Sequence, residues 1–367
     1  MLWVRSLTVT APLTVAAVLT VAAALLTALV ASGWAAPPNP CTAGSEALGR
    51  RDLPAAERLL KECLSREPAR QSAFVELAAV YQAQGNTAAL QALARQGLKR
   101  FPNEPRFHLT VGIHAGREGR FDEAVDVLAA GLRRWPADSR FQKNLVDAYV
   151  SRGLAALDEG SNEAAERDLS SALKLDASQA EAWLNVGRAL HNLNRSVESM
   201  SAFERALKVD PRTPLAEFHR GMVSYTLRDY DQAIAALSRE IERNPDYPPA
   251  YQFRGLARMF KAQWSEAVAD LAIAAGKMPG DAEVLYALGR CLNQLGQMAE
   301  AEAAFRKTIE LSPSSPRAYY SLGRLLSDDG RAPEAQELFD KAAALHATAR
   351  VAAPGEIRFK SLRTRKP

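Results

Sequence analysis

Residues 181–211 read EAWLNVGRALHNLNRSVESMSAFERALKVDP and contain two amphipathic helical patterns separated by a turn. The first pattern places its apolar and small residues on one helical face: Trp183, Val186, Gly187 and Leu190. The second pattern has its own apolar face: Val197, Phe203, Ala206 and Leu207. Asn194 marks the turn between them, and Pro211 ends the second pattern. This periodicity predicts a helical hairpin.

The same pattern recurs along most of the chain with a period of 34 residues. Proline closes seven of the repeats: Pro68, Pro102, Pro136, Pro211, Pro245, Pro279 and Pro313. Glycine forms a second column: Gly44, Gly112, Gly153, Gly187, Gly221, Gly255, Gly289 and Gly323. Such self-similarity predicts an array in which each repeat packs on its neighbours. We expect nine repeats, beginning near residues 37, 71, 105, 139, 180, 214, 248, 282 and 316.

The glycine column needs a packing reason, because glycine inside a helix costs up to about 1 kcal/mol relative to alanine. A column of small residues recurs in the second helices: Ala56, Ala124, Ala165, Ala233, Ala267, Ala301 and Ala335. We therefore expect the two helices of a hairpin to approach closely at these small residues, with the large residues of the second helix filling space toward the next repeat. The second repeat has Ala78 and Leu90 in these columns, so its helices should pack less closely.

These columns closely resemble the tetratricopeptide-repeat pattern from about Pro37 to Thr348. The resemblance implies an all-α fold, a right-handed superhelical solenoid of about nine helical hairpins. It also implies that the first helices line a concave groove that holds an extended peptide or a helix. The pattern is specific for the fold and not for the function, because its columns encode packing.

Carried over to this sequence, the resemblance assigns fourteen residues to the groove: Leu184, Arg188, His191, Phe218, Met222, Tyr225, Gln252, Leu256, Met259, Tyr286, Arg290, Asn293, Tyr320 and Arg324. Aromatic, methionine and arginine side chains often dominate binding surfaces. Arg188, Arg290 and Arg324 each follow the glycine of their repeat and suit carboxylate or phosphate partners. For any single residue, packing between repeats or exposure to solvent is the alternative; for the groove as a whole we favour binding.

One interval is irregular, because Gly112 and Gly153 lie 41 residues apart, seven more than the period. Seven residues add about two helical turns and keep the helix face in register. The spacing predicts an extended first helix near residues 139–152. A neutral insertion and a ridge for partner docking both remain open.

The segment 1–36 is expected to be a signal sequence or a signal-anchor transmembrane helix. Arg5 precedes a run of uncharged, mostly apolar residues from Leu7 to Ala31 that is long enough to span about 30 Å of hydrocarbon. Small residues before Pro37 would permit cleavage. Both alternatives place the repeats outside the cytoplasmic membrane, in the periplasm or at the cell surface.

An exported location favours disulfide bonds. Cys41 would open the first helix of repeat one and Cys63 lies near the end of its second helix, so the two ends are neighbours in a hairpin. We expect a Cys41–Cys63 disulfide, although Cys63 also falls in a column of small core residues. Cys291, beside Gly289, is expected to be a buried thiol.

The charge distribution and the motifs exclude several functions. The net charge is +4, but much of it lies in residues 350–367, a basic tail that we expect to be flexible. The repeats themselves are close to neutral, which argues against nucleic-acid binding. The five histidines show no metal-binding spacing, and phosphate-loop and nucleophile motifs are absent. We expect no enzymatic activity, no cofactor and no metal.

The last repeat, ending near residue 349, has no full amphipathic helix after it, although solenoids usually need a polar cap. Contact with a partner, self-association and a cover made by the tail are all open. The sequence favours a non-enzymatic scaffold for a protein or peptide ligand, in an envelope secretion, pilus or exopolysaccharide assembly. The alternative is an accessory protein that binds acidic polysaccharide or lipid headgroups through the groove arginines and the basic tail.

Overall fold

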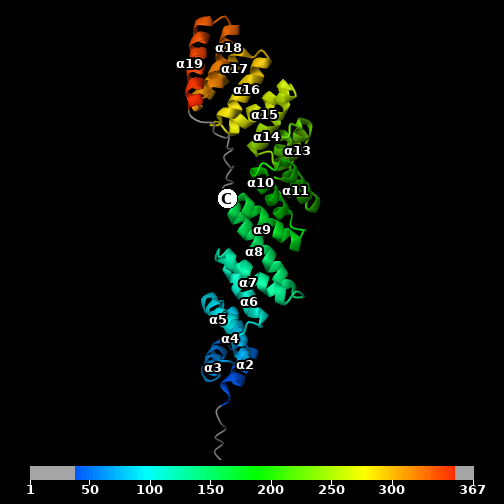
Figure 1. The fold of residues 1–367 in the computed structure, drawn as a ribbon, viewed down its shortest axis with the longest axis vertical. Helices are drawn as coiled ribbons and strands as arrows, with labels where there is room; N and C mark the ends of the chain where they lie inside the picture. The colour runs from blue at the N-terminus through cyan, green and yellow to red at the C-terminus, as the bar shows by residue number, and fades with distance from the viewer. Residues whose placement is uncertain (1–37, 352–367) are drawn as a thin grey trace, which may run out of the picture. The chain divides into compact units, whose positions relative to one another are not determined.

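The computed structural model describes residues 38–351, which form eighteen helices and no strand. The first helices of the nine hairpins are α2 (Pro40–Gly49), α4 (Gln71–Gln84), α6 (Pro105–Arg117), α8 (Ser139–Asp158), α10 (Ala180–Asn192), α12 (Ala216–Thr226), α14 (Pro248–Phe260), α16 (Ala282–Gln294) and α18 (Pro316–Asp328). The second helices are α3 (Leu53–Arg66), α5 (Thr87–Arg100), α7 (Phe121–Arg134), α9 (Asn162–Leu175), α11 (Ser196–Val209), α13 (Tyr230–Arg243), α15 (Trp264–Lys277), α17 (Met298–Leu311) and α19 (Ala332–Val351). The predicted all-helical array of hairpins is confirmed (Figure 1).

The helices group into two compact units, with the division between Leu145 and Val146, inside α8. The first unit contains the hairpins α2–α3, α4–α5 and α6–α7. The second unit contains α9–α19 and the larger part of α8. Within residues 38–351, no helix combines the length and the apolar character that crossing a bilayer requires. The predicted signal or anchor segment, residues 1–36, and residues 352–367 of the tail lie outside the described residues.

The repeats begin close to the predicted positions, since seven of the nine first helices begin at the expected residue. The first hairpin starts later, at Pro40, because the Asn39 side chain caps α2 by accepting a hydrogen bond from the Cys41 N–H. The sixth starts at Ala216, because Leu215 adopts a left-handed conformation with φ 60° and cannot belong to the helix. Every second helix except α19 has 14 residues.

Each hairpin turns through one residue with positive φ, seven residues after the position of its glycine column. Five of these residues are glycines and four are not: Arg51, Gly85, Gly119, Gly160, Asn194, Arg228, Ala262, Gly296 and Gly330. Glycine adopts this conformation without a steric cost, whereas a side chain makes it unfavourable. The sequence Asp328-Asp329-Gly330 is therefore part of a turn.

The glycine column allows close helix approach, but the contact differs from the expected one. A Cβ added at Gly187 would lie 2.5 Å from the Phe203 ring, and one at Gly221 would lie 2.6 Å from Leu237 Cγ. The large residue of the second helix thus lies directly against the glycine, a contact that we did not expect, and it also reaches the next repeat as expected, since the Phe203 ring stacks on His219 of α12. The small alanines also contribute, since the Ala233 carbonyl oxygen would lie 3.3 Å from the Gly221 Cβ.

The second hairpin packs less closely, as its two departures predict. Helices α4 and α5 contact each other over a smaller part of their lengths than the helices of the hairpins α2–α3, α6–α7 and α10–α11. Leu90 replaces alanine there and Ala78 replaces glycine, so both added side chains hold the helices apart.

The predicted disulfide is present, with the Cys41 and Cys63 sulfurs 2.08 Å apart and both side chains buried. The bond joins the start of α2 to the end of α3. Cys291 is a buried free thiol, and burial raises the pKa of this thiol to about 11.

The seven extra residues lengthen α8 to 20 residues, against 13 in α6 and α10. The helix begins at Ser139 as predicted but ends at Asp158 instead of Arg152. The error has a simple cause: first helices continue five residues beyond their glycine, as α10 does from Gly187 to Asn192. The predicted end ignored this last turn.

We predict that Gly187→Ala lowers the free energy of unfolding by about 1–3 kcal/mol, because the new methyl group overlaps the Phe203 ring. Gly276 in α15 is the matched control, since nothing lies within 4 Å of a Cβ built there. Gly276→Ala should raise the free energy by up to about 1 kcal/mol. Chemical denaturation followed by circular dichroism measures both, and equal effects would contradict the packing role.

The disulfide closes a loop with a sequence separation of 22 residues. Replacing both Cys41 and Cys63 by alanine should therefore destabilise the first hairpin by about 3 kcal/mol. Hydrogen exchange of the α2 and α3 amides measures this loss, with the α12–α13 amides as internal reference. Unchanged exchange in α2 would show that packing alone holds the hairpin.

Candidate functional site

In the second unit the first helices form one layer, because α10 contacts α12, α12 contacts α14, α14 contacts α16, and α16 contacts α18. All fourteen residues assigned to the groove from sequence lie on these five helices. The candidate site therefore lies within the second unit, whose helices α10, α14, α16 and α18 are labelled in Figure 1.

Burial separates two of the fourteen residues from the rest. Phe218 is 1% exposed and Met259 is 6% exposed, so neither side chain is available to a ligand. Phe218 instead packs edge-on against the rings of His219, Tyr247 and Phe253, with centroids 5.0–5.9 Å apart. Both residues are core residues, and their assignment to the groove was wrong in this respect.

The other twelve residues retain exposed surface, and we call them the inner surface. Nine are half-buried: Leu184, Arg188, His191, Met222, Tyr225, Gln252, Leu256, Tyr286 and Asn293. Three are exposed: Arg290, Tyr320 and Arg324. The exposed members lie on α16 and α18, at the carboxyl-terminal part of the array.

Tyr286 is held in place by its neighbours. Its hydroxyl lies 3.2 Å from Ser321 Oγ, and the Arg317 guanidinium lies over its ring at 4.6 Å from the centroid. Arg317 also pairs with Glu283. Tyr320, by contrast, is 53% exposed. The two tyrosines thus offer one fixed and one open aromatic surface.

The arginines of the second unit fall into two classes. Arg254 and Arg258 both bind Asp270, with N–O distances of 2.7 and 2.6 Å, and Asp270 is buried. Arg290 and Arg324 make no ion pair with any carboxylate in residues 38–351. The first class stabilises the hairpin, and the second is free to bind an external anion.

Sequence reasoning missed the Arg254–Asp270 pair, although a signal for it exists. Arg152 binds Asp168 in the same way, at 2.7 Å. In both hairpins arginine directly precedes the column glycine and aspartate follows 16 residues later. Two matching pairs at repeat-equivalent positions indicate an intra-hairpin ion pair.

Arg188 lies at the other end of the inner surface, in α10. It donates a hydrogen bond to Asn185 Oδ1 at 2.8 Å. Burial, with a smaller effect of Arg188, lowers the pKa of His219 to about 3, and the His219 ring stacks on Phe203. Burial also lowers the pKa of His191. Both histidines are therefore neutral at pH 7, and Arg188 carries the local charge.

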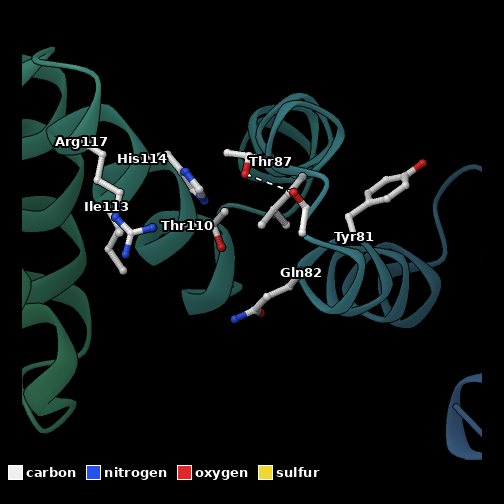
Figure 2. Close-up of a pocket in the computed structure, with 9 residues that line it drawn as sticks. Tyr81, Gln82, Thr87, Thr110, Ile113, His114 and Arg117 are labelled. Carbon is white, nitrogen blue, oxygen red and sulfur yellow. Dashed lines mark hydrogen bonds between the residues drawn. The ribbon is translucent and has the colours of Figure 1, made fainter.

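The first unit contains a cavity of about 280 Å³ that sequence reasoning did not predict. Figure 2 shows its lining residues, which come from the end of α4, the start of α5 and the face of α6. They are mostly polar: Tyr81, Gln82, Gly85, Thr87, Leu90, Thr110, Ile113, His114 and Arg117. The cavity lies at the loosely packed second hairpin. Ala78 and Leu90, which replace the usual glycine and alanine of this repeat, are the sequence feature that could have indicated it.

His114 in this cavity has a lowered pKa, because of burial and the nearby Arg117. Arg117 is thus the cation of the cavity at neutral pH, surrounded by hydroxyl and amide groups. Among residues 38–351 no three His, Cys, Asp or Glu side chains gather in a way that could hold a metal ion.

We predict opposite effects for two aromatic residues of the original groove assignment. Phe218→Ala should destabilise the protein by about 3–5 kcal/mol, because it leaves a hole in the core. Tyr320→Ala should change stability by less than about 1 kcal/mol, because most of this side chain is exposed. Thermal unfolding of both variants tests the distinction, and a small loss for Phe218→Ala would restore that residue to the surface.

Many solved structures are similar to this chain. They include MamA, at 23% identity, TM-score 0.43 and coverage of 45% of this chain and 97% of that one, and YrrB, at 21% identity, TM-score 0.46 and coverage of 50% and 95%. YrrB is described as a tetratricopeptide-repeat protein with an unusual peptide-binding site. No curated protein matches the chain.

Tetratricopeptide-repeat family patterns match residues 78–139, 109–154, 150–205, 200–248, 254–316 and 296–353. These matches cover more than half of the chain and agree with the observed hairpins. The chain belongs to the tetratricopeptide-repeat family.

Proposed function

We propose that this protein is a non-enzymatic scaffold that binds an extended, acidic segment of a partner protein along its inner surface. Proteins of this repeat family are generally scaffolds for protein or peptide binding. The observation that carries the proposal is the state of Arg290 and Arg324, which are exposed and have no carboxylate partner in the described chain. Nearby Arg254, Arg258 and Arg317 are all neutralised.

The spacing of the free cations suits an extended peptide. Arg290 and Arg324 occupy the same position in successive first helices, and packed helices lie about 10 Å apart. An extended polyproline-II chain has three residues per turn and advances about 3.1 Å per residue, so carboxylates three residues apart lie on one side and would match the two guanidinium groups. Arginine binds carboxylates through two parallel hydrogen bonds, which also fixes the direction of the ligand.

The aromatic residues supply the apolar part of the interaction. Tyr286 is positioned by Ser321 and Arg317, and Tyr320 is largely exposed, so both present ring surface beside the free arginines. Tyrosine and arginine together are the residue types that most often dominate protein interfaces. At the other end, Arg188 would extend the same contact to a longer ligand.

We also propose that the protein acts outside the cytoplasmic membrane, in an envelope secretion, pilus or exopolysaccharide assembly. The apolar run from Leu7 to Ala31 after Arg5 supports export. The Cys41–Cys63 disulfide adds support, because disulfides persist in oxidising compartments. Membrane attachment would follow if residues 1–36 are retained.

The inner surface is tested with a fluorescent twelve-residue peptide that has glutamate at every third position among serine and glycine. The double variant Arg290→Ala/Arg324→Ala should weaken binding at least about 100-fold, since each charge-assisted hydrogen-bonded pair contributes about 1.5–3 kcal/mol. Fluorescence anisotropy measures the dissociation constant. The control is Arg167→Ala in α9, an exposed arginine of a second helix, which should leave binding unchanged.

Equal affinity of the double variant and the unchanged protein would refute the assignment. A lysine-for-glutamate version of the peptide should not bind. Tighter binding of alginate than of the peptide would favour the alternative, an accessory protein for acidic polysaccharide. Cross-linking in cells, followed by identification of the captured protein, would then name the partner.

A further inference from the structure

The outer face of the last hairpin is uncovered among residues 38–351. It carries an open cavity of about 660 Å³ lined by Tyr320, Phe339, Ala342, Ala343 and His346. Phe339 is half-buried, whereas its counterparts in the other hairpins, such as Phe203 and Phe305, are at most 1% exposed. In those hairpins the following first helix completes the burial, and no described helix follows α19.

The uncovered face has a hollow shape. Ala343 occupies the position that holds Leu207, Ile241 and Ile309 in other hairpins. With Ala342 beside it, α19 presents only small side chains in this part of the face, and the rings of Tyr320 and Phe339, with centroids 5.6 Å apart, form one wall of the cavity. A hollow of this kind fits a large apolar side chain of whatever covers it.

A carboxylate stands at the edge of the hollow. Helix α19 exposes Asp340, which lies one turn before Ala343 on the same side of the helix, whereas the exposed Glu337 and Lys341 lie together on the other side. Neither carboxylate forms an ion pair within the described chain. The occupant of this face should therefore be apolar and basic.

We propose that residues 356–362 of the same chain cover this face, with Phe359 filling the hollow. This segment reads EIRFKSL, and it combines the apolar Ile357, Phe359 and Leu362 with Arg358 and Lys360. Its composition thus complements both the hollow and the carboxylate at its edge. Pro354-Gly355 provides the reversal of direction after α19.

The connection is long enough for this contact. From Val351 to Ala343, α19 runs back about 12 Å, at about 1.5 Å per residue. The eight residues from Val351 to Phe359 can extend to about 26 Å. Phe359 therefore reaches Ala343 with length to spare. A connection within one chain also gives the segment a high effective concentration, so a short apolar contact suffices.

Hydrogen exchange on the full chain tests the proposal. Removing residues 352–367, or Phe359→Ala, should increase amide exchange in α18 and α19 about tenfold and leave α12–α15 unchanged. These variants alter only the segment outside the array, so the hairpins themselves stay folded. Ser361→Ala is the matched control and should have no effect. A synthetic peptide of residues 352–367, added to the truncated protein, should restore protection.

A second variant tests the hollow itself. Ala343→Leu introduces the side chain that other hairpins carry there, so Phe359→Ala should have no further effect in its presence. Exchange in α19 that does not respond to removal of residues 352–367 would overturn the proposal. Protection that survives the truncation and rises with protein concentration would assign the face to a second copy. These hydrogen-exchange experiments contain no acidic peptide. Their result is therefore independent of whether the inner surface binds such a peptide.

Discussion

The contact between the glycine of each first helix and the large residue of the paired second helix is the constraint on which the hairpins depend. At Gly187 the Phe203 ring occupies the space that a Cβ would fill, and Leu237 does the same at Gly221. Seven hairpins bury their large residue through this contact, with the next hairpin covering it; the second hairpin has alanine at both positions, and the last has no described hairpin after it. Because each repeat needs its neighbour, the inner surface acquires its regular spacing from packing in the core.

Most of the fold was predictable because its information is local and repeated. Proline and glycine columns located seven of nine helix starts, and the columns of small residues indicated close packing. The end of α8 was predicted six residues early, because the last helical turn carries no column of its own. The contact of Phe203 with Gly187 was also missed, although its contact with the next repeat was predicted, since periodicity defines a helix face but not every neighbour that the side chain contacts.

The candidate site was less accessible to sequence reasoning. A repeat position gives the helix face of a residue, yet burial depends on the residues around it. Phe218 and Arg290 illustrate this difference: Phe218 is enclosed by three aromatic rings, while Arg290 is exposed. Whether an arginine forms an ion pair likewise depends on a second residue at another repeat position, as Arg254 and Asp270 show. A single column of repeat-equivalent positions does not show the carboxylate that neutralises an arginine. Unpaired and ion-paired arginines therefore could not be distinguished from the columns.

The turns have a consequence for the order in which the array assembles. Hairpins α16–α17 and α18–α19 reverse through Gly296 and Gly330, whereas the three preceding hairpins use Asn194, Arg228 and Ala262 in a conformation that side chains disfavour. Locally, the glycine hairpins close most easily, and the others need an adjoining hairpin as a template. Folding of the second unit would then start at its glycine hairpins, α8–α9 and the two carboxyl-terminal ones, and spread toward the hairpins between them; one of these starting points already contains Arg290 and Arg324.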